Sequence, residues 1–583
     1  MEPGEFLDFL RQGEILFYRE DEVATVTVRK VASKLSLAID GKVDATNSAD
    51  MMTQRLLAHI PLLLHPAPKD VLVIGLGSGV TAGSALTHSI ESLVAVEISD
   101  AVVEASRFFD ELSHRPSTDP RFRLVVGDGR NHLLLSGRPY DVIISEPSNP
   151  WMAGVSGLFT REFFELARDR LAPGGLFCQW AHIYNMSETD LKTIVASFTD
   201  AFHDSALFLL SESDILLVGA KESLPLVSSD ELDDRMDGDG VRDELLEVGV
   251  RGSYGIRALL SASTPPLSEW AREADRHTDD RPLLEFRAAR TLHQDTSREN
   301  RSAIKSIGIG ESVLDAATDP SPEDLLARGE ALERAESFEW AFETFAEAVE
   351  KEPRLPAALE SLVRCAIRAG RAHEAERMLK TMTEPVSLGR LYRRLARFDE
   401  ALEAISDALE VDPGRREALL LGAEVSGDRG DTAAMARFAE LILARDPLDA
   451  EAAALLAEVR LREGDLERAS RESASILARR PDEARALQVH AIAHAELGNR
   501  NLARDSFEKL LEIEPEDGIQ LNNLGKLELA AGDSKRAAEL FERAVDLNPR
   551  NLEGYRGLEE AAKKIGDATR LERARSMVRF LSK

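Results

Sequence analysis

The chain has 583 residues, of which 43% are hydrophobic and 30% are charged, a composition that favours folded domains and excludes a largely disordered protein. The formal net charge of -31 argues against nucleic acid or an anionic membrane as the main partner. Two distant cysteines exclude a disulfide framework, and the lack of a basic N-terminal stretch and of any long apolar run predicts a cytoplasmic protein without a membrane span.

Residues 14–45 alternate apolar and polar side chains, which is the pattern of strands buried on one face. Turn residues interrupt the pattern at Glu20–Asp21 and at Asp40–Gly41. We therefore expect a small antiparallel sheet, and we assign residues 1–50 to an N-terminal β-sheet region.

Short apolar runs alternate with helical stretches over residues 51–220. Five runs, each followed by a helix-like segment, predict parallel strands at 70–75, 92–98, 123–128, 140–146 and 175–180. Two further runs, separated by three residues, predict an antiparallel edge hairpin at 205–210 and 214–220. The region is therefore expected to form a seven-stranded, doubly wound Rossmann-like domain.

A glycine-rich loop, VIGLGSGVTAG, follows the first of these strands. Gly75 permits a tight turn, while Gly77 and Gly79 let a ligand approach the backbone where a helix begins. Many strand–helix turns carry glycines only for packing, so the loop by itself is weak evidence for a binding site.

Acidic residues stand at the ends of the next two strands. Glu97 ends the second strand, where a carboxylate can accept two hydrogen bonds from ribose hydroxyls. Asp128, in a GDG sequence that ends with Gly129, could hold an adenine amino group. Together with the glycine-rich loop these residues predict an adenosine site, which would also suit an NAD enzyme.

The fourth strand runs into the sequence SEPSNPWMAGVSGLFT. Glu146 stands at its carboxyl end, where ligands bind in this architecture. Asn149 and Trp151 follow in a rigid turn, and Gly154 and Gly157 are expected to leave the next loop mobile. A carboxylate, an aromatic side chain and a lid beside an adenosine site argue against an NAD enzyme.

Residues 221–318 show little periodicity and are rich in Asp, Ser and Arg, so we assign them to an extension and linker.

Glycine and proline recur every 34 residues in the remainder of the chain. The glycines are Gly430, Gly464, Gly498, Gly532 and Gly566, and the prolines are Pro413, Pro447, Pro481, Pro515 and Pro549. A turn glycine and a helix-ending proline in one register predict one pair of helices per repeat. The pattern resembles the tetratricopeptide repeat family, so residues 319–583 are expected to form an all-α solenoid with one truncated unit near residues 381–395.

The order of motifs in the first half resembles the spermidine synthase family over residues 14–220. The matching features are LAIDGKV, the helix DMMTQRLLAHIPLLLH, the glycine-rich loop, Glu97, GDG, the carboxylate after strand four, and CQW. Members combine a small N-terminal sheet with a seven-stranded domain of the methyltransferase type. They transfer an aminopropyl group from decarboxylated S-adenosylmethionine to an amine, and the resemblance implies no metal.

The resemblance also implies roles for individual residues. Gln54, Glu97 and Asp128 would contact the nucleoside donor, beside the loop residues Gly75, Gly77, Ser78, Gly79 and Gly129. A carboxylate at the end of strand four can attract an ammonium ion and accept its proton, so Glu146 is the predicted catalytic base. Asn149 and Trp151 are predicted to line the site of a small amine or polyamine acceptor.

Three motifs depart from the family pattern. The family loop usually reads GGGDGG, and its acid, which attracts the donor's amine and repels a carboxylate, is replaced by Ser78. The two aspartates of the strand-four motif are replaced by Glu146 and Asn149, and the tyrosine before Gln54 is Thr53. The changes together remove charge for holding a polyamine. Ser78 weakens discrimination against intact S-adenosylmethionine, so both forms of the co-substrate are retained as candidates.

Three functions are compatible with these residues. The first is an aminopropyltransferase-like enzyme that favours the decarboxylated donor, and the second is a methyltransferase that uses intact S-adenosylmethionine on the same fold. The third is a non-catalytic nucleoside-binding scaffold whose function lies in the repeats. A protein or peptide partner on the repeats, a homodimer and the identity of the acceptor are left open by the sequence.

Overall fold

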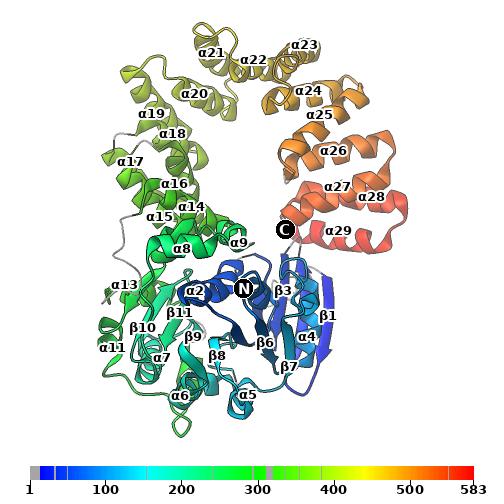
Figure 1. Ribbon diagram of the computed structural model, residues 1–583. Helices are drawn as coiled ribbons and strands as arrows, with labels where there is room; N and C mark the ends of the chain where they lie inside the picture. Colours follow the sequence, from blue (N-terminus) through cyan, green and yellow to red (C-terminus); the bar gives the residue numbers. More distant parts are fainter. Residues whose placement is uncertain are drawn as a thin grey trace. The chain divides into compact units, whose positions relative to one another are not determined.

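The computed structural model describes residues 14–582 apart from short gaps at 32–33, 49, 153, 239, 292–293, 310–319, 335–336, 354, 383, 516 and 549. The described chain divides into two compact units (Figure 1): the first extends to Arg371, and the second comprises the residues from Ala372 onward together with Val31. The expected start of the β-sheet region, the expected boundary at 318–319 and Pro549 lie outside the described residues. Within the described residues, no helix combines the length and apolar character needed to cross a bilayer.

A small four-stranded sheet, in the order β1-β2-β3-β4, begins the first unit. Its strands are β1 (Glu14–Glu20), β2 (Thr25–Val31), β3 (Lys34–Ile39) and β4 (Lys42–Thr46). The β3–β4 turn places Asp40 and Gly41 at φ values of 50° and 83°, as a tight hairpin requires. Val28 and Leu37 on its inner face belong to one apolar cluster with Phe109. The predicted sheet and both predicted turns are therefore confirmed.

The larger sheet of the first unit has eight strands in the order β12-β10-β11-β9-β8-β5-β6-β7. They are β5 (Asp70–Ile74), β6 (Ser92–Glu97), β7 (Phe122–Val126), β8 (Tyr140–Ser145), β9 (Leu171–His182), β10 (Ser205–Leu209), β11 (Asp214–Ala220) and β12 (Leu260–Ser263). Strands β5 to β9 are parallel, and β10 and β11 form the predicted antiparallel hairpin. The predicted Rossmann-like fold is therefore confirmed, with one strand more than expected.

The additional strand, β12, comes from the extension and pairs with β10 in antiparallel orientation. The β10–β11 hairpin therefore does not form the edge of the sheet, contrary to expectation. With only four residues, LSAS, this strand is too short for its apolar pattern to stand out in the sequence.

Helices cover both faces of the larger sheet, since almost all consecutive residues of β5 and β8 are buried. The helices that matter for the site are α2 (Met51–Leu64), α3 (Val80–Leu86), α4 (Asp100–Ser106), α5 (Gly129–Leu135), α6 (Arg161–Asp169) and α7 (Glu188–Ala201).

Part of the extension is tied to the sheet's helices by a buried polar network. Glu244, in α9 (Val241–Glu247), has its carboxylate 2.8 Å from Nε2 of His59 in α2. The other ring nitrogen of His59 lies 2.9 Å from Nε2 of His88. All three side chains are buried. The extension therefore packs against the helix that carries Gln54.

The predicted helix pairs follow, and the first helices belong to the first unit. These are α14 (Pro322–Arg334), α15 (Phe338–Lys351) and α16 (Pro356–Arg368). The second unit contains α17 (Ala372–Thr381), α18 (Pro385–Arg394), α19 (Phe398–Val411), α20 (Arg416–Asp428), α21 (Thr432–Leu443), α22 (Ala450–Arg462), α23 (Leu466–Leu477), α24 (Ala484–Glu496), α25 (Arg500–Ile513), α26 (Gly518–Ala531), α27 (Ser534–Leu547), α28 (Leu552–Ile565) and α29 (Ala568–Leu581).

The backbone conformation agrees with the predicted role of the recurring glycines as turn residues. The five recurring glycines all have φ values between 76° and 94°, the left-handed conformation that a glycine turn provides. The predicted truncated unit is also present, since α17 and α18 have only 10 residues each.

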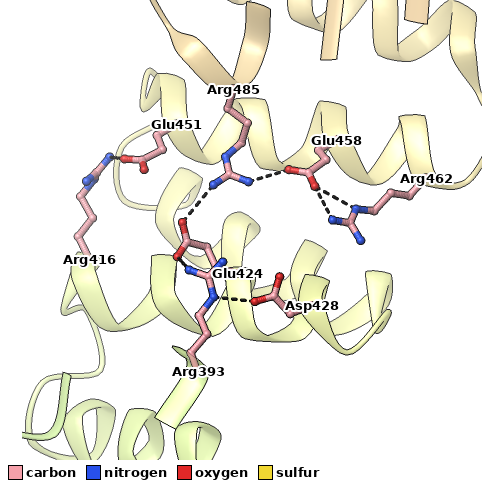
Figure 2. Close-up of polar contacts among 8 residues, drawn as sticks. All are labelled: Arg393, Arg416, Glu424, Asp428, Glu451, Glu458, Arg462 and Arg485. Carbon is pink, nitrogen blue, oxygen red and sulfur yellow. Dashed lines mark hydrogen bonds and ion pairs between the residues drawn. The ribbon is translucent and has the colours of Figure 1, made fainter. Parts of the chain in front are cut away.

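Ion pairs link the first helices of successive pairs in the second unit (Figure 2). Arg485 of α24 donates to Glu424 of α20 at 3.1 Å and to Glu458 of α22 at 2.7 Å. Arg393 of α18 also contacts Glu424 and lies 2.7 Å from Asp428. These side chains are partly exposed, so each pair stabilises the array only slightly, but the shared network connects four successive pairs.

Candidate active site

The candidate site lies where the strand order of the larger sheet reverses, between β5 and β8. Ligands of open α/β sheets bind at such a point, outside the carboxyl ends of the strands. Gly75 follows β5, and a Cβ on it would lie 2.4 Å from the backbone oxygen of Glu146, which follows β8. Its φ of 94° also favours glycine. Glycine at this position therefore lets the glycine-rich loop touch the residue predicted to be the base.

The other glycines of the predicted donor site have different surroundings. A Cβ on Gly77 would meet no described atom within 4 Å, so the space beside this residue is open. Gly79 is the N-cap of α3. A Cβ on Gly129 would lie 2.4 Å from the side chain of Ile74, so glycine is needed there for packing.

Glu97 ends β6, and backbone N–H groups fix its carboxylate. Oε2 accepts a hydrogen bond from the N–H of Leu76 at 2.9 Å, and Oε1 accepts one from the N–H of Ser99 at 3.0 Å. The residue is 7% exposed, and its burial raises the pKa of Glu97, against the lowering effect of the backbone N–H groups. Each carboxylate oxygen has a second lone pair, so the fixed group can still accept ribose hydroxyls.

The structure brings Gln54 and Ser78 together. The buried hydroxyl of Ser78 donates to Oε1 of Gln54, while Nε2 of Gln54 lies 3.4 Å from the backbone oxygen of Thr46. The hydroxyl of Thr81 donates to the backbone oxygen of Gln54 at 3.0 Å. Ser78 therefore orients Gln54, a role that the sequence comparison with the family loop does not suggest.

Asp128 is exposed and has a structural role in addition to the predicted one. Its Oδ1 accepts a hydrogen bond from the N–H of Asn131 at 2.6 Å and so caps α5. The cap engages one of the two carboxylate oxygens, which leaves Oδ2 for the predicted contact with an adenine amino group.

Glu146 has a strongly perturbed acidity. Burial raises the pKa of Glu146 to about 8, a hydrogen bond with Thr81 lowers it, and the negative charges of Asp50 and Glu97 raise it further. Perturbed acidities of this kind cluster at functional sites. Without a cation beside it the carboxyl group is largely protonated at neutral pH, and a bound cation would favour its ionised form.

Two further acids belong to the same end of the site. Burial and the negative charge of Asp214 raise the pKa of Asp50 to about 6. Asp50 in turn acts on Glu146, as described above. Asp50 is the N-cap of α2, Glu146 follows β8 and Asp214 begins β11, so three parts of the chain contribute acids that act on one another in sequence, Asp214 on Asp50 and Asp50 on Glu146.

The charge of Asp214 is not neutralised by its partners. Oδ2 accepts a hydrogen bond from the hydroxyl of Thr53 at 3.0 Å, and Oδ1 accepts one from Nε1 of Trp180 at 3.1 Å. Lys42 pairs instead with Asp44 at 2.5 Å. Within the described ranges, no lysine or arginine forms an ion pair with any of the three acids of this end. The region therefore offers negative charge to a ligand.

Buried polar atoms without a hydrogen-bond partner among the described residues surround these acids. They are Oγ of Ser145, Oδ1 of Asn149, Oε1 of Gln179 and both ring nitrogens of His182. The sheet register pairs Ser145 with Gln179 and places His182 opposite Asp214. Burial lowers the pKa of His182, so its imidazole is neutral. Because buried polar groups are normally paired, these acceptor-rich atoms indicate a ligand that donates hydrogen bonds.

Aromatic rings border the same end of the site. Trp151 meets His182 edge-on, with ring centroids 4.4 Å apart and planes at 84°. The ring of Tyr184 lies 4.7 Å from that of His182, and its hydroxyl accepts a hydrogen bond from Nδ2 of Asn149 at 3.2 Å. The predicted acceptor residues Asn149 and Trp151 are therefore brought together, in surroundings that favour a cation.

The loop expected to be a mobile lid is anchored by the extension. Nε2 of His277 lies 2.9 Å from the backbone oxygen of Ser156, and the N–H of Arg161 donates to the backbone oxygen of His277 at 2.9 Å. The hydroxyl of Ser156 lies 3.3 Å from Glu285. The sequence does not reveal that distant residues hold this loop, and its mobility stays a prediction.

Four contributors to the acceptor end are missing from the sequence-based prediction: Asp50, His182, Tyr184 and Asp214. For His182 a signal existed, because β9 continues two residues beyond the expected end at Trp180 and its true carboxyl end carries polar and aromatic residues. Asp214 begins β11, and its approach to α2 depends on tertiary packing that no local pattern reveals.

Comparison with known proteins assigns both parts of the chain. Residues 50–211 match the family described as spermine/spermidine synthase domain, and residues 386–434 and 489–551 match the tetratricopeptide repeat family. The chain therefore carries a spermidine synthase-type domain followed by tetratricopeptide repeats, as its motifs predict.

Individual relatives match only part of the chain. Spermidine synthase of Dictyostelium discoideum is 37% identical over 153 residues, which cover 25% of this chain and 54% of that protein. Putrescine N-methyltransferase 2 of Nicotiana attenuata is 34% identical over 206 residues, which cover 35% of this chain and 55% of that protein. The crystal structure of spermidine synthase from Thermotoga maritima has a TM-score of 0.32 at 24% identity, covering 36% of this chain and 72% of that one. The chain thus spans little more than half the length of these two curated relatives.

Proposed function

We propose that this protein is a spermidine synthase-like transferase that moves an alkyl group from an S-adenosylmethionine-derived donor to an amine, with the decarboxylated donor favoured. The family match of residues 50–211 supports the reaction class. In this proposal Glu97, Gln54 and the glycine-rich loop hold the nucleoside, and Asp128 holds its base. Glu146 and the acids beside it receive the amine.

Glu146 has two tasks in the proposed reaction. It attracts the acceptor as an ammonium ion and then accepts one proton, which frees the lone pair of the nitrogen. The nitrogen forms a bond to a carbon next to the sulfonium sulfur, and the carbon–sulfur bond breaks with its electron pair remaining on sulfur. A neutral thioether leaves, which is methylthioadenosine when the donor is decarboxylated. Fixing the amine in line with that bond lowers the entropic part of the barrier.

The observation that carries the proposal is the group of acids at the acceptor end, none of which forms an ion pair with a lysine or arginine of the described residues. The negative charge of Asp214 raises the pKa of Asp50, and that of Asp50 raises the pKa of Glu146, and buried acceptor atoms lie beside them. Such an arrangement repels an anionic substrate and is stabilised by a cation that donates several hydrogen bonds. An alkylammonium ion has both properties.

A methyltransferase is the second candidate, and two observations favour it. Ser78 is neutral and engaged with Gln54, so it does not repel the carboxylate of intact S-adenosylmethionine. The relative that matches over 206 residues carries the name putrescine N-methyltransferase. The same acceptor site would serve this reaction, with a methyl group in place of the aminopropyl group.

Calorimetric titration of the full chain with both donors tests the proposal. We expect decarboxylated S-adenosylmethionine to bind more tightly, because the acids of the acceptor end repel the carboxylate of the intact donor. Tighter binding of the intact donor would favour the methyltransferase. If neither donor nor methylthioadenosine binds, the result would favour the hypothesis of a non-catalytic scaffold.

The pKa of Glu146 predicts that kcat/KM rises with pH up to an unusually high value of pH. The pKa of about 8 means that the free enzyme holds its base in the protonated form below that value. Alkylammonium groups titrate near ~10.4, so the acceptor keeps its charge across this range. We expect kcat/KM to rise about tenfold per pH unit up to about pH 8 and then level off. If kcat/KM instead levelled off near the ordinary pKa of a carboxyl group, Glu146 would not be the base.

The same shift has a consequence for stability that requires no substrate. The pKa of Glu146 in the folded protein, about 8, lies above its ordinary value of 4.5. Its contribution to stability is therefore fully present below the ordinary value and is lost as the pH rises through the folded value. Thermal unfolding from about pH 5 to pH 9 should show this loss in the wild type and a smaller one in Glu146→Gln.

We further propose that the repeats of the second unit recruit a protein or peptide, since repeat arrays present extended binding surfaces. Formation of a homodimer stays a prediction, which light scattering of the full chain would test.

A further inference from the structure

The turn of the β10–β11 hairpin connects the acceptor end of the site with the repeat array. It consists of Ser211, Glu212 and Ser213, directly before Asp214. The hydroxyls of Ser211 and Ser213 donate to Oδ2 of Asp214 at 2.8 and 3.0 Å. With Thr53 and Trp180 they bring the neutral donors on this carboxylate to four. The conformation of the turn therefore sets the position of Asp214.

Glu212, between the two serines, contacts the first helix pair of the array. Its Oε1 accepts a hydrogen bond from the N–H of Trp340, in the first turn of α15, at 2.5 Å. The N-cap residue of α15, Ser337, makes no capping hydrogen bond with its side chain. Glu212 thus satisfies a free N–H group of the repeat helix from the loop of another domain.

Other contacts hold this helix pair against the same part of the sheet. Nη1 of Arg328, in α14, donates to the backbone oxygen of Ala258 at 2.9 Å. Arg301, in α13 (Ser297–Lys305), lies 3.2 Å from Glu343 of α15. All of these residues belong to the first unit. The first helix pair is therefore part of the unit that carries the candidate site.

The packing beside the hairpin is incomplete. A cavity of about 280 Å³ lies between β10, β12 and the two repeat helices, and its lining includes Leu209, Leu260, Arg328, Trp340 and Glu347. The space next to the end of β10 is therefore not filled on the side of α14 and α15, although Leu209 and Leu210 are themselves buried. The hydrogen bond from Trp340 to Glu212 is then the direct connection between α15 and the turn.

We propose that Glu212 is a positioning residue that couples α15 to the acceptor end of the site. By accepting the hydrogen bond from Trp340 it holds the turn in the conformation in which Ser211 and Ser213 orient Asp214. The inference rests on the proposed function in one respect, that Asp214 contributes to acceptor binding. Loss of the contact should weaken binding of the acceptor and leave binding of the nucleoside unchanged.

Three full-length variants test this inference. Glu212→Ala removes the hydrogen-bond acceptor, whereas Glu212→Gln retains a carbonyl oxygen at the same place and serves as the conservative variant. Glu343→Ala removes the ion pairs of the same helix with Arg301, Lys305 and Arg371 but no hydrogen bond of the turn, and is the matched control. We expect Glu212→Ala to raise the KM for putrescine at least fivefold and to leave the Kd for methylthioadenosine within twofold. The other two variants should keep both constants near the wild-type values.

Several results would overturn the inference. These are an unchanged KM in Glu212→Ala, an equal loss of acceptor and nucleoside binding, or the same change in Glu343→Ala. The second and third of these results would show that the substitutions loosen the contact between the first helix pair and the sheet in general.

Hydrogen–deuterium exchange separates this inference from the proposed reaction. The N–H of Leu210 donates to the backbone oxygen of Asp214 at 2.9 Å, and the N–H of Ser213 donates to the hydroxyl of Ser211 at 3.2 Å. Both should exchange faster in Glu212→Ala but not in Glu212→Gln or Glu343→Ala. That result would support the coupling even if no amine were turned over, and unchanged exchange in Glu212→Ala would refute it.

Discussion

Replacement of Glu146 by glutamine is expected to lower turnover by about 10²–10⁴-fold, which is the range that a general base contributes. Glutamine keeps the shape of the side chain but can neither accept the proton nor attract the ammonium ion. The carboxyl group is largely protonated when no cation is present, so the amide resembles the free enzyme and the fold should persist. Initial rates with putrescine and the decarboxylated donor, together with the calorimetric Kd for methylthioadenosine, check both expectations.

A matched substitution shows whether the effect is specific. Glu165 is on α6 in the same domain, with its carboxylate 3.6 Å from Arg161 and its side chain 46% exposed. Glu165→Gln should therefore retain wild-type rates. Wild-type turnover in Glu146→Gln would move the base elsewhere and would favour the methyltransferase or scaffold hypothesis.

Replacement of Glu97 by alanine is expected to weaken methylthioadenosine binding at least tenfold. Two hydrogen bonds from ribose hydroxyls to a carboxylate would be lost, each contributing about 1.5–3 kcal/mol. The substitution also frees the N–H groups of Leu76 and Ser99, which the carboxylate now accepts from, so the glycine-rich loop loses a support. Calorimetric titration with methylthioadenosine measures the loss, and circular dichroism checks that the domain is folded.

The control for this prediction is Glu104→Ala. Glu104 is on α4, with half of its side chain exposed, and pairs with Arg19 at 2.6 Å. Its removal should leave nucleoside binding within twofold of the wild type. If Glu97→Ala binds methylthioadenosine as well as the wild type does, the nucleoside is bound elsewhere.

Much of the architecture could be predicted from local patterns. The strands β5 to β11, the hairpin turn at Asp40–Gly41 and the register of the repeats all follow from apolar periodicity and from glycine and proline spacing. β12 could not be predicted, because four residues carry too little periodic signal and pair only after the extension has folded against the sheet.

The candidate site likewise has a part that could be predicted from the sequence and a part that could not. The donor side lies on loops that follow consecutive strands, so Gly75, Glu97 and Asp128 could be identified from their position after each strand. The acceptor side is assembled from elements far apart in the chain: Asp50 begins α2, and Asp214 begins β11. The sequence therefore indicates a loss of charge at Ser78 and Asn149, whereas the structure supplies acids at other positions.

The most direct test of the account is identification of the products of the full-length wild-type protein by mass spectrometry. The protein would be incubated with putrescine and with each donor separately. We predict methylthioadenosine and an acceptor enlarged by one aminopropyl group from the decarboxylated donor. Methylated putrescine and S-adenosylhomocysteine from the intact donor alone, or no product from either donor despite retained nucleoside binding, would contradict it.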